Sequence, residues 1–285
     1  MSTAEILTDE TRALVRTALD EDLRYGDDVT TLATVPADAF TTAAFVSREE
    51  GVVAGLDVAL LVLDEVLGIG GYTVTQRVDD GTRVAQGTVV LEVRAQTRGL
   101  LTAERTALNL LGHLSGIASE TARWVEAVAG TTARIRDSRK TLPGLRALQK
   151  YAVRVGGGVN HRMGLGDAAL VKDNHVAAAG SVVAALRAVR EAAPDLPCEV
   201  EVDTLEQLDE VLREGVELVL LDNFPVWQTQ IAVQRRAAVS PETKLESSGG
   251  LSLDAAADYA ATGVDYLAVG ALTHSVRVLD IGLDM

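Results

Sequence analysis

The spacing of hydrophobic and polar positions divides the 285-residue chain into two parts with different patterns. Up to about residue 100, apolar residues either recur with helical spacing or alternate with polar residues over short runs. This spacing predicts helices over Thr8–Leu19 and Leu56–Leu67, and extended segments over Thr41–Val46, Tyr72–Arg77 and Thr88–Arg94. These elements indicate an α+β N-terminal domain with a small sheet.

A long helical pattern over Thr102–Ala129 connects the two parts, and from Ala133 onward short apolar runs alternate with helical stretches. The expected strands are Arg134–Asp137, Ala168–Lys172, Cys198–Val202, Glu217–Asp222, Lys244–Ser248 and Asp265–Val269. The expected helices are Pro143–Val155, Ser181–Ala193, Leu205–Glu214, Val226–Val239 and Leu253–Thr262. Successive βα units of this length favour an open or incomplete α/β barrel, with a doubly wound sheet as the alternative.

We therefore predict an α+β domain over residues 1–110, which includes the start of the connecting helix, and an α/β-barrel catalytic domain over residues 111–285. The last residues could return to the N-terminal domain. A hydrophobic content of 47% supports a full core, and Cys198 is the only cysteine, which excludes an intrachain disulfide. The acidic N-terminus lacks a signal-peptide pattern, so a cytoplasmic protein is expected.

The distribution of charged residues argues against some classes of binding partner. Acidic residues interrupt the most apolar stretch, Gly51 to Gly71, which argues against a membrane span. A net charge of -15 and a pI near 4.7 argue against nucleic-acid binding. Basic residues nevertheless gather between Asp137 and His175: Arg139, Lys140, Arg146, Lys150, Arg154, His161, Arg162 and Lys172. Such a cluster in an acidic chain favours a site for a small, multiply anionic ligand.

Part of this basic cluster has a simpler explanation. Arg146, Lys150 and Arg154 recur every four residues and could share one exposed helix face. Arg139, Lys140 and Lys172 instead stand at the ends of apolar runs, where a solvated helix face does not account for them.

Polar residues follow most of the predicted strands. The strands end in Asp137–Lys140, Lys172–His175, Glu201–Asp203, Asp222–Asn223 and Glu246–Gly250, and Gly270 follows the last strand. In α/β barrels the carboxyl ends of the strands share one face, which carries the active site. We therefore expect these residues to converge on a single cleft.

Two kinds of charge would meet on that face. Arg139, Lys140, Arg162 and Lys172 can bind carboxylates or phosphates. Glu201 and Asp222 offer oxygen ligands suited to Mg²⁺ or to sugar hydroxyls, although an acid that caps the next helix is an equal alternative for each. Together the two sets predict a phosphorylated sugar held with a metal.

Further candidates carry weaker signals. Ser247–Gly250 ends a strand before a helix and could bind a phosphate together with Gly270, although a plain turn is the common explanation for such a loop. Arg105 is expected in the first turn of the long helix, where a cation opposes the helix dipole. It could reach a site across a domain or subunit boundary, or it could be a simple surface arginine. His161 and His274 are candidate donors to anionic oxygens.

The chain resembles the quinolinate phosphoribosyltransferase family, also called nicotinate-nucleotide pyrophosphorylase (carboxylating). The matching motifs are ERTALNLLGHLSGIAS, DSRKTLPGLRALQKYAV, GGGVNHRMGLGD, LVKDNH, EVEVDTLEQ, LLDNF, LESSGGL and VDYLAVGALTHS, in this order from Glu104 onward. The motif positions Ser138, Leu142 and Gln149 depart from the threonine, threonine and glutamate that the family often carries.

The resemblance implies a reaction and a set of roles. Quinolinate and 5-phosphoribosyl 1-diphosphate would give nicotinate mononucleotide, diphosphate and CO₂ with Mg²⁺, in NAD biosynthesis. It implies a homodimer in which Arg105 comes from the partner subunit and joins Ser138, Arg139, His161, Arg162 and Lys172 around the quinolinate carboxylates. Lys140, Glu201 and Asp222 would hold the ribose, diphosphate and metal. Ser248, Gly249, Gly270 and His274 would bind the 5-phosphate.

Three other functions fit parts of the pattern. A nicotinate phosphoribosyltransferase that does not decarboxylate would need fewer cations. A Schiff-base aldolase would use Lys172 as its nucleophile at a strand end. A non-catalytic anion-binding module would keep the cations but would not need Glu201 and Asp222.

Overall fold

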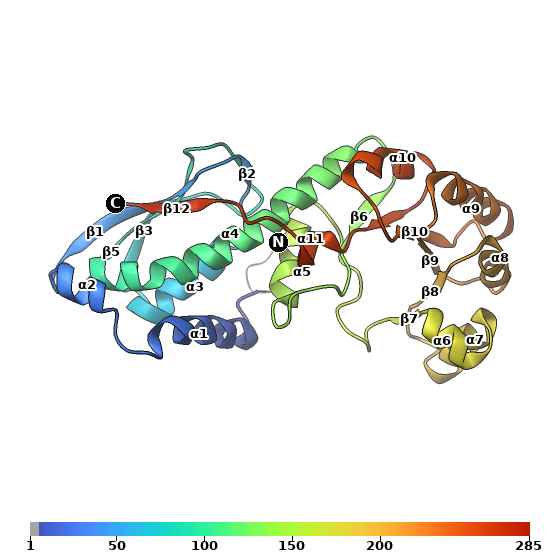
Figure 1. Cartoon of the computed structure of the whole chain (residues 1–285), viewed down its shortest axis with the longest axis horizontal. Helices are drawn as coiled ribbons and strands as arrows, with labels where there is room; N and C mark the ends of the chain where they lie inside the picture. The colour runs from blue at the N-terminus through green and yellow to red at the C-terminus, as the bar shows by residue number, and fades with distance from the viewer. Residues whose placement is uncertain (1–5) are drawn as a thin grey trace. The chain divides into compact units, whose positions relative to one another are not determined.

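The computed structural model describes residues 6–285 and divides into two compact units (Figure 1). The first unit combines the chain up to Ala122 with Leu142–Gly156 and Thr273–Met285. The second contains Arg123–Thr141 and Gly157–Leu272. The chain therefore passes from one unit to the other several times, whereas the sequence pattern suggested one change near residue 110 and left open a return of the last residues.

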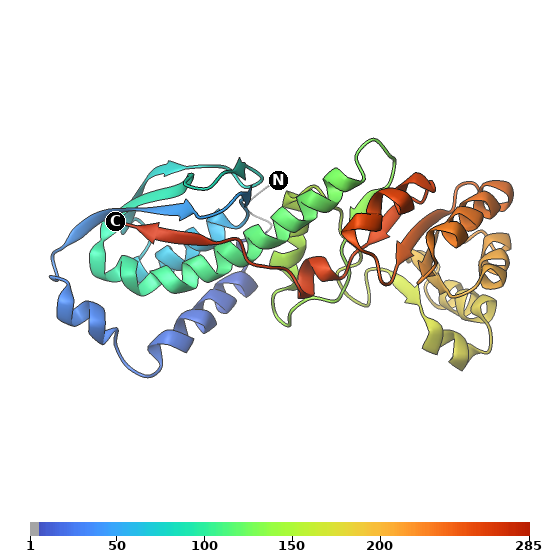
Figure 2. The same cartoon turned by 45° about the horizontal axis from the view of Figure 1, so that its top comes forward.

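The first unit contains a four-stranded antiparallel sheet in the order β12 (Ile281–Asp284), β1 (Phe40–Ser47), β5 (Val89–Gln96) and β3 (Tyr72–Arg77). Figure 2 shows α4 (Thr97–Ala127) running along this sheet. Phe45 and Leu91 pair across β1 and β5 and are fully buried, which is the alternation expected of a sheet with one covered face. The predicted small sheet is confirmed, and β12 is an addition to it.

The remaining elements of the first unit are short apart from three helices. These helices are α1 (Asp9–Leu23), α3 (Leu56–Leu67) and α5 (Arg146–Val155), and the short elements are α2 (Val29–Thr34), β2 (Gly51–Val52) and β4 (Arg83–Val84). Thr8 caps α1 by accepting a hydrogen bond from the Thr11 N–H at 3.2 Å. The helix predicted from Thr8 therefore begins one residue later, behind its cap.

Two expectations about basic residues in the first unit are wrong. The long helix begins at Thr97, directly after β5, so Arg105 lies in its third turn and the argument from an opposed helix dipole does not apply. Lys150 is fully buried, so Arg146, Lys150 and Arg154 do not form a common exposed face. The reason is that α5 is held inside the first unit: Gln149 donates to the Thr273 carbonyl at 2.8 Å and Tyr151 donates to Asp80 at 2.7 Å.

The second unit is built on a six-stranded parallel sheet. Its strands in order are β6 (Arg134–Arg136), β11 (Tyr266–Ala268), β10 (Lys244–Ser248), β9 (Leu218–Asp222), β8 (Cys198–Val202) and β7 (Ala169–Val171). Its helices are α6 (Asp173–Ala179), α7 (Val182–Ala192), α8 (Leu205–Arg213), α9 (Val226–Val239), η2 (Leu253–Ala255) and α10 (Ala256–Ala261), and α11 (Ala271–His274) follows at the unit boundary. From β7 to β11, each successive strand pairs with the preceding one on the same side of the growing sheet, as in a barrel. Strands β6 and β7 form the two edges of the sheet and do not pair with each other, so the barrel is not closed. The predicted open α/β barrel is confirmed. The doubly wound alternative does not fit, because the strand order of such a sheet reverses direction within the sheet.

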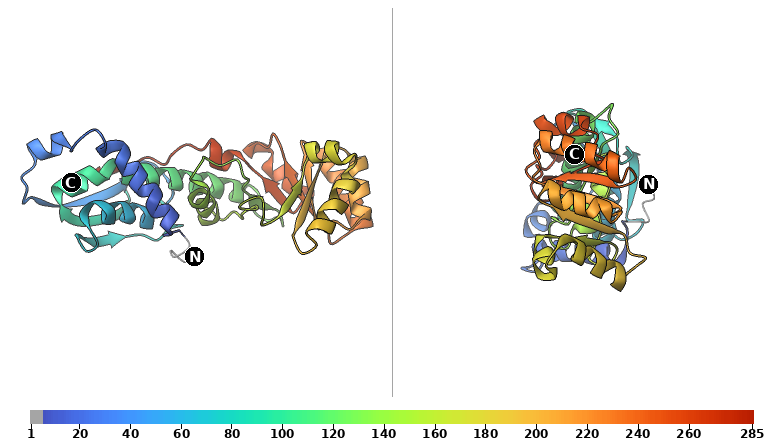
Figure 3. Two further views of the ribbon diagram at one scale, coloured as in Figure 1. Left: turned by 90° about the horizontal axis from the view of Figure 1, so that it is seen from below. Right: turned by 90° about the vertical axis from the view of Figure 1, so that its right-hand side faces the viewer.

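The two faces of the parallel sheet differ in polarity. Aligned residues of parallel strands project their side chains to the same side, so the pairing register shows which residues share a face. One row of aligned residues is Val202, Leu221, Ser247, Leu267 and Ile135, all buried. Helices α7, α8 and α9 lie along one side of the sheet (Figure 3). Rows of the opposite face hold Glu201, Leu220, Glu246, Tyr266 and Arg134, and then Asp222, Ser248, Ala268 and Arg136. The functional candidates therefore occupy one face.

Over residues 6–285, no helix combines the length and the hydropathy needed to cross a bilayer.

Candidate active site

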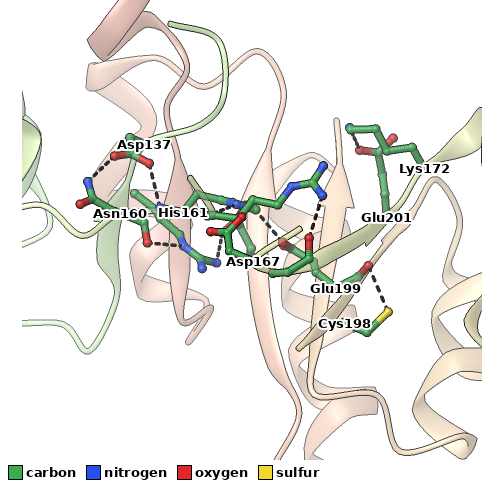
Figure 4. Close-up of polar contacts among 12 residues, drawn as sticks. Asp137, Asn160, His161, Asp167, Lys172, Cys198, Glu199 and Glu201 are labelled. Atoms are coloured by element: carbon green, nitrogen blue, oxygen red, sulfur yellow. Dashed lines mark hydrogen bonds and ion pairs between the residues drawn. The ribbon is translucent and has the colours of Figure 1, made fainter. Parts of the chain in front are cut away.

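The carboxyl edge of the parallel sheet brings together residues from four neighbouring strands. Lys172 follows β7, Glu201 lies near the end of β8, and Asp222 and Ser248 end β9 and β10. Lys172 Nζ forms a close ion pair with Glu201 Oε2, in which the lysine side chain is 45% exposed and the glutamate 9% (Figure 4). The predicted convergence of these strand ends is present within the second unit.

A glycine-containing turn follows β10 and meets the end of β9. The Asn223 N–H donates to the Ser248 carbonyl at 2.8 Å, and the Asn223 side-chain amide donates to Asp222 Oδ2 at 2.7 Å. Gly249 has φ +86° and Gly250 has φ +60°, in the left-handed region that glycine tolerates. Ser248 and Gly249 are therefore held against the end of β9 and remain partly exposed to a ligand.

Arg139 and Arg162 form the cationic part of the site. Each has a buried Nε–H without a hydrogen-bond partner. Arg162 Nη1 donates to the Ala168 carbonyl at 2.8 Å, while burial, followed by the neighbouring Arg139 charge, lowers the pKa of the Arg162 guanidinium. Two buried donors under mutual repulsion are an arrangement that an anionic ligand would relieve.

The segment from Gly157 to Ala168 presents Arg162 and His161 to this site. Val159 forms a parallel bridge with Arg136, next to the edge strand β6. Asp137 is fully buried and accepts a hydrogen bond from the His161 N–H at 2.7 Å and another from the Asn160 side chain (Figure 4). The carboxylate at the end of β6 therefore fixes the segment that carries the two basic residues.

His161 also joins a buried cluster on the same face of the sheet. Its Nε2 lies 2.7 Å from Glu199 Oε2 and 3.8 Å from Glu246 Oε1, and Arg136 Nη1 lies 2.7 Å from Glu246 Oε2. Burial raises the pKa of Glu199 to about 7, against the opposite effect of Arg136. Burial and the Glu199 charge raise the pKa of Glu246 to about 7 as well. We call His161, Glu199, Glu246 and Arg136 the buried acid cluster.

A cavity of about 320 Å³ adjoins this cluster. Its lining residues are Arg136, Asn160, His161, Arg162, Asp167, Ala168, Pro197, Cys198, Glu199, Glu217 and Leu218. Pro197 and Glu217 precede β8 and β9, so the cavity lies toward the amino ends of these strands and reaches Arg162 and His161 from that side.

The other predicted site residues divide between the two units. In the second unit, Ser138 Oγ accepts a hydrogen bond from the Lys140 N–H at 3.0 Å, Lys140 is exposed, and Gly270 follows β11. Arg105 and His274 belong to the first unit. Arg105 is exposed and makes no side-chain hydrogen bond or ion pair within residues 6–285, and His274 Nδ1 lies 2.6 Å from Ser275 Oγ.

Sequence reasoning missed Glu199 and Arg136 as parts of the site, and it included Glu246 among the strand-end residues without giving it a role. Glu199 and Glu246 each occupy a position inside a short strand whose neighbours in sequence are buried. A charged residue at such a position is a usable signal, because an unpaired buried carboxylate is costly.

Comparisons with known proteins follow the same two-part division of the sequence. Residues 28–115 match the quinolinate phosphoribosyl transferase N-terminal domain, and residues 117–284 match the quinolinate phosphoribosyl transferase C-terminal domain. The chain is 71% identical over 277 residues to nicotinate-nucleotide pyrophosphorylase [carboxylating] of Mycobacterium leprae, covering 97% of this chain and 98% of that protein.

Solved structures agree with the sequence relatives. The nicotinate-nucleotide pyrophosphorylase of Francisella tularensis superposes with a TM-score of 0.90 at 36% identity, covering 97% of this chain and 96% of that chain. NadC from Streptococcus pyogenes gives a TM-score of 0.90 at 38% identity, covering 96% and 95% of the two chains. The predicted resemblance is confirmed: the chain belongs to the quinolinate phosphoribosyltransferase family.

Proposed function

We propose that this protein transfers the phosphoribosyl group of 5-phosphoribosyl 1-diphosphate to quinolinate, with release of diphosphate and CO₂, and so makes nicotinate mononucleotide for NAD synthesis. The Mycobacterium leprae relative is named nicotinate-nucleotide pyrophosphorylase [carboxylating], and both matching domain families are named for quinolinate phosphoribosyl transferase. The observation that supports it most directly is the pair Arg139 and Arg162, whose buried Nε–H groups lack partners. Two guanidinium groups suit a ligand with two carboxylates better than a ligand with one.

In this proposal Arg139 and Arg162 bind the quinolinate carboxylates, and Lys172 and Ser138 would contribute to the same site. His161 was predicted to donate to the same ligand, yet both of its ring nitrogens already face protein groups. Its contribution is then to orient Arg162, whose backbone N–H donates to His161 Nδ1. The cations also offset the charge that two carboxylates bring into a partly buried site.

The phosphorylated ribose would lie along the carboxyl edge of the sheet. The turn at Ser248 and Gly249 supplies backbone N–H groups for the 5-phosphate, with Gly270 beside it. Lys140 is exposed near the same edge and can contact the diphosphate as a point charge. His274 belongs to the other unit and remains a predicted contributor to the 5-phosphate.

Glu201 and Asp222 fit the Mg²⁺ that the family reaction implies. They lie on the same face of adjacent strands, and within residues 6–285 each has one carboxylate oxygen without a hydrogen-bond partner. Carboxylate oxygens are the protein ligands that Mg²⁺ prefers, with phosphates completing its shell. When bound, the ion would neutralise charge on the diphosphate.

The chain's own residues would act mainly by charge and position. As the bond between ribose C1 and diphosphate breaks, positive charge develops at C1, and nearby carboxylates such as Glu201 and Asp222 can stabilise it. The pyridine nitrogen then bonds to C1, and the ring becomes cationic. Loss of the 2-carboxylate as CO₂ leaves an electron pair at ring carbon 2, which the ring cation stabilises until a proton arrives.

We propose a homodimer in which Arg105 of one subunit completes the quinolinate site of the other. The supporting observation is that Arg105 is exposed in the third turn of α4 and has no partner among the described residues. An arginine on a helix can present a fixed fork to a carboxylate.

The proposed location is the cytoplasm. Cys198 is a free, buried thiol, which suits a reducing compartment. Cell fractionation with antibodies against the native protein would test this, and enrichment outside the cytoplasmic fraction would contradict it.

The proposed reaction can be tested with purified protein, 5-phosphoribosyl 1-diphosphate and Mg²⁺. Quinolinate labelled at the 2-carboxyl group and nicotinate are supplied in separate reactions. We expect labelled CO₂ and nicotinate mononucleotide in equal amounts from quinolinate, and no product from nicotinate. Mononucleotide from nicotinate alone would instead identify the non-decarboxylating transferase, and binding without turnover of either would identify an anion-binding protein.

A further inference from the structure

The buried acid cluster contains two carboxyl groups, Glu199 and Glu246, and one arginine, Arg136. Glu246 is fully buried and Glu199 is 4% exposed, while Arg136 is the arginine within hydrogen-bond distance of either. Arg136 also stacks on the Tyr266 ring at 4.7 Å, which fixes its position. Glu199 Oε1 and Glu246 Oε1 have no hydrogen-bond partner. Such carboxylates are costly, so their presence needs a role beyond packing.

His161 connects this cluster to the cationic part of the site. Its Nδ1 accepts a hydrogen bond from the Arg162 backbone N–H at 2.7 Å, so the ring hydrogen is on Nε2 and points to Glu199 at 2.7 Å. Both ring nitrogens are therefore used within the protein. A histidine held by hydrogen bonds at both ring nitrogens fixes the backbone of Arg162 relative to Glu199.

The charges around the Arg162 guanidinium favour the same arrangement as these hydrogen bonds. Arg139 repels the Arg162 guanidinium, whereas Asp167 and, after it, Glu199 attract it. The acids can therefore keep the two arginines near each other while no ligand is bound. Preorganisation of this kind lowers the cost of binding an anion.

We propose that Glu246 and Glu199 are positioning residues for the quinolinate site: anchored by Arg136, they hold His161, and His161 holds Arg162 where it binds a carboxylate. This inference rests on the proposed function, because it takes Arg162 as a quinolinate ligand. It predicts that the cluster controls affinity for quinolinate, while the binding of 5-phosphoribosyl 1-diphosphate depends on other residues.

A cation bound by the cluster is a competing explanation, since His161, Glu199 and Glu246 offer ligand atoms within 4.8 Å of one another. The hydrogen bonds argue for positioning. A cation would need His161 Nε2 without its hydrogen, and the ring would then carry that hydrogen on Nδ1, against the Arg162 N–H.

The test compares Glu246→Gln with the double variant Arg136→Gln/Glu246→Gln. The double variant removes both charges, so no unpaired arginine charge is left buried if the single variant fails to fold. Glu214→Gln is the matched control, because Glu214 pairs with Arg187 at 2.6 Å on the exposed surface of the same unit. For each protein we would measure Tm, kcat and the two KM values, and quinolinate binding by calorimetry.

We expect both Glu246 variants to raise KM for quinolinate at least tenfold, with KM for 5-phosphoribosyl 1-diphosphate changed less than twofold. The Glu214 control should match the wild type. A structural role alone would lower Tm or the active fraction and leave both KM values unchanged, and this result would overturn the proposal. Stoichiometric metal in the wild-type protein that Glu246→Gln loses would also overturn it. Absence of quinolinate turnover by the wild type would instead refute the proposed function, and the inference with it.

Discussion

Gly249 has no room for a side chain because Asn223 lies directly against it. A Cβ atom built on Gly249 would come within 2.3 Å of Asn223 Oδ1 and 3.0 Å of the Asn223 backbone nitrogen. The same asparagine has φ +55° and donates to Asp222. The turn proposed to bind the 5-phosphate and the proposed metal ligand Asp222 are therefore coupled through one residue.

We expect Gly249→Ala to weaken 5-phosphoribosyl 1-diphosphate binding and to lower the free energy of unfolding by about 1–3 kcal/mol. Gly215→Ala is the matched control, because Gly215 has φ +63° with open space around it. The control should lose about 1 kcal/mol through backbone strain and keep its activity. Urea titration and substrate kinetics measure both effects, and equal kinetics for the two variants would contradict the prediction.

Lys172 should act as a charge and not as a nucleophile. Its amine is already engaged by Glu201, whereas an imine requires that amine free. We expect Lys172→Met to lower kcat/KM for quinolinate by about 100-fold. Borohydride with a carbonyl compound should add no mass to the wild-type protein, as mass spectrometry would establish.

The matched control for Lys172 is Lys244→Met. Lys244 is also exposed and ion-paired, to Asp265 at 3.0 Å, but it lies at the amino end of its strand. It should keep full activity. A borohydride adduct that disappears in Lys172→Met would support the aldolase alternative.

Arg105 can be tested by mixing subunits. Arg105→Ala and Arg139→Ala should each be inactive, yet a mixed dimer would contain one intact site if Arg105 acts across the interface. After denaturation and joint refolding, half of the dimers are mixed, so activity should return to about one quarter of wild type. No recovery, with both variants folded by circular dichroism, would place Arg105 in its own subunit's site, and full activity of Arg105→Ala alone would place it outside any site.

Because the pKa of Glu246 is raised in the folded protein, its contribution to the free energy of unfolding falls as pH rises. Its folded value of about 7 lies above the ordinary 4.5, so the folded state holds a proton that the unfolded state releases. The stabilisation from this group is present below pH 4.5 and is lost as pH rises to about 7. The difference in unfolding free energy between wild type and Glu246→Gln should therefore fall over this range, as urea titrations at several pH values would measure. A difference that rises with pH would contradict the assignment.

Asp80 is expected to stabilise the first unit. Its carboxylate accepts from the Gly55 and Leu56 N–H groups at 2.7 and 3.1 Å, and from the Tyr151 hydroxyl at 2.7 Å. Loss of a cap with charged hydrogen bonds should cost about 2–4 kcal/mol in Asp80→Ala. Exposed Asp79 provides the control, and Asp79→Ala should change the unfolding free energy by less than about 0.5 kcal/mol.

The sequence pattern predicted the sheet of the second unit well because each strand is short, apolar on one face and followed by polar residues. Glu201 and Asp222 could be found in this way. Glu246 was also listed there, but without a role. Glu199 could not be found from strand ends, because it lies inside its strand, and the partners of both glutamates come from distant segments. Hydrophobic periodicity identifies which residues lie on one face of the sheet. It does not identify which charged side chains contact one another on that face.

Long-range pairing explains most of the remaining differences. The β12 strand has four residues, too few for a clear alternation, and it forms by pairing with β1. Lys150 belongs to a helix whose surface pattern appeared solvated, and only the packing of α5 revealed its burial. The start of α4 was placed late because Gly99 is a poor helix former, which tertiary contacts overcome.

The pairing of Ala44 with Asp284 has a consequence for how the protein is made. At a synthesis rate of about 5–20 residues per second, β1 leaves the ribosome roughly 10 to 50 seconds before its partner β12 exists. Through this interval the hydrogen-bonding edge of β1 that β12 will cover has no strand from the first unit to pair with. A nascent chain therefore carries an open sheet edge until β12 has been made, and this edge is where a chaperone would protect it from aggregation.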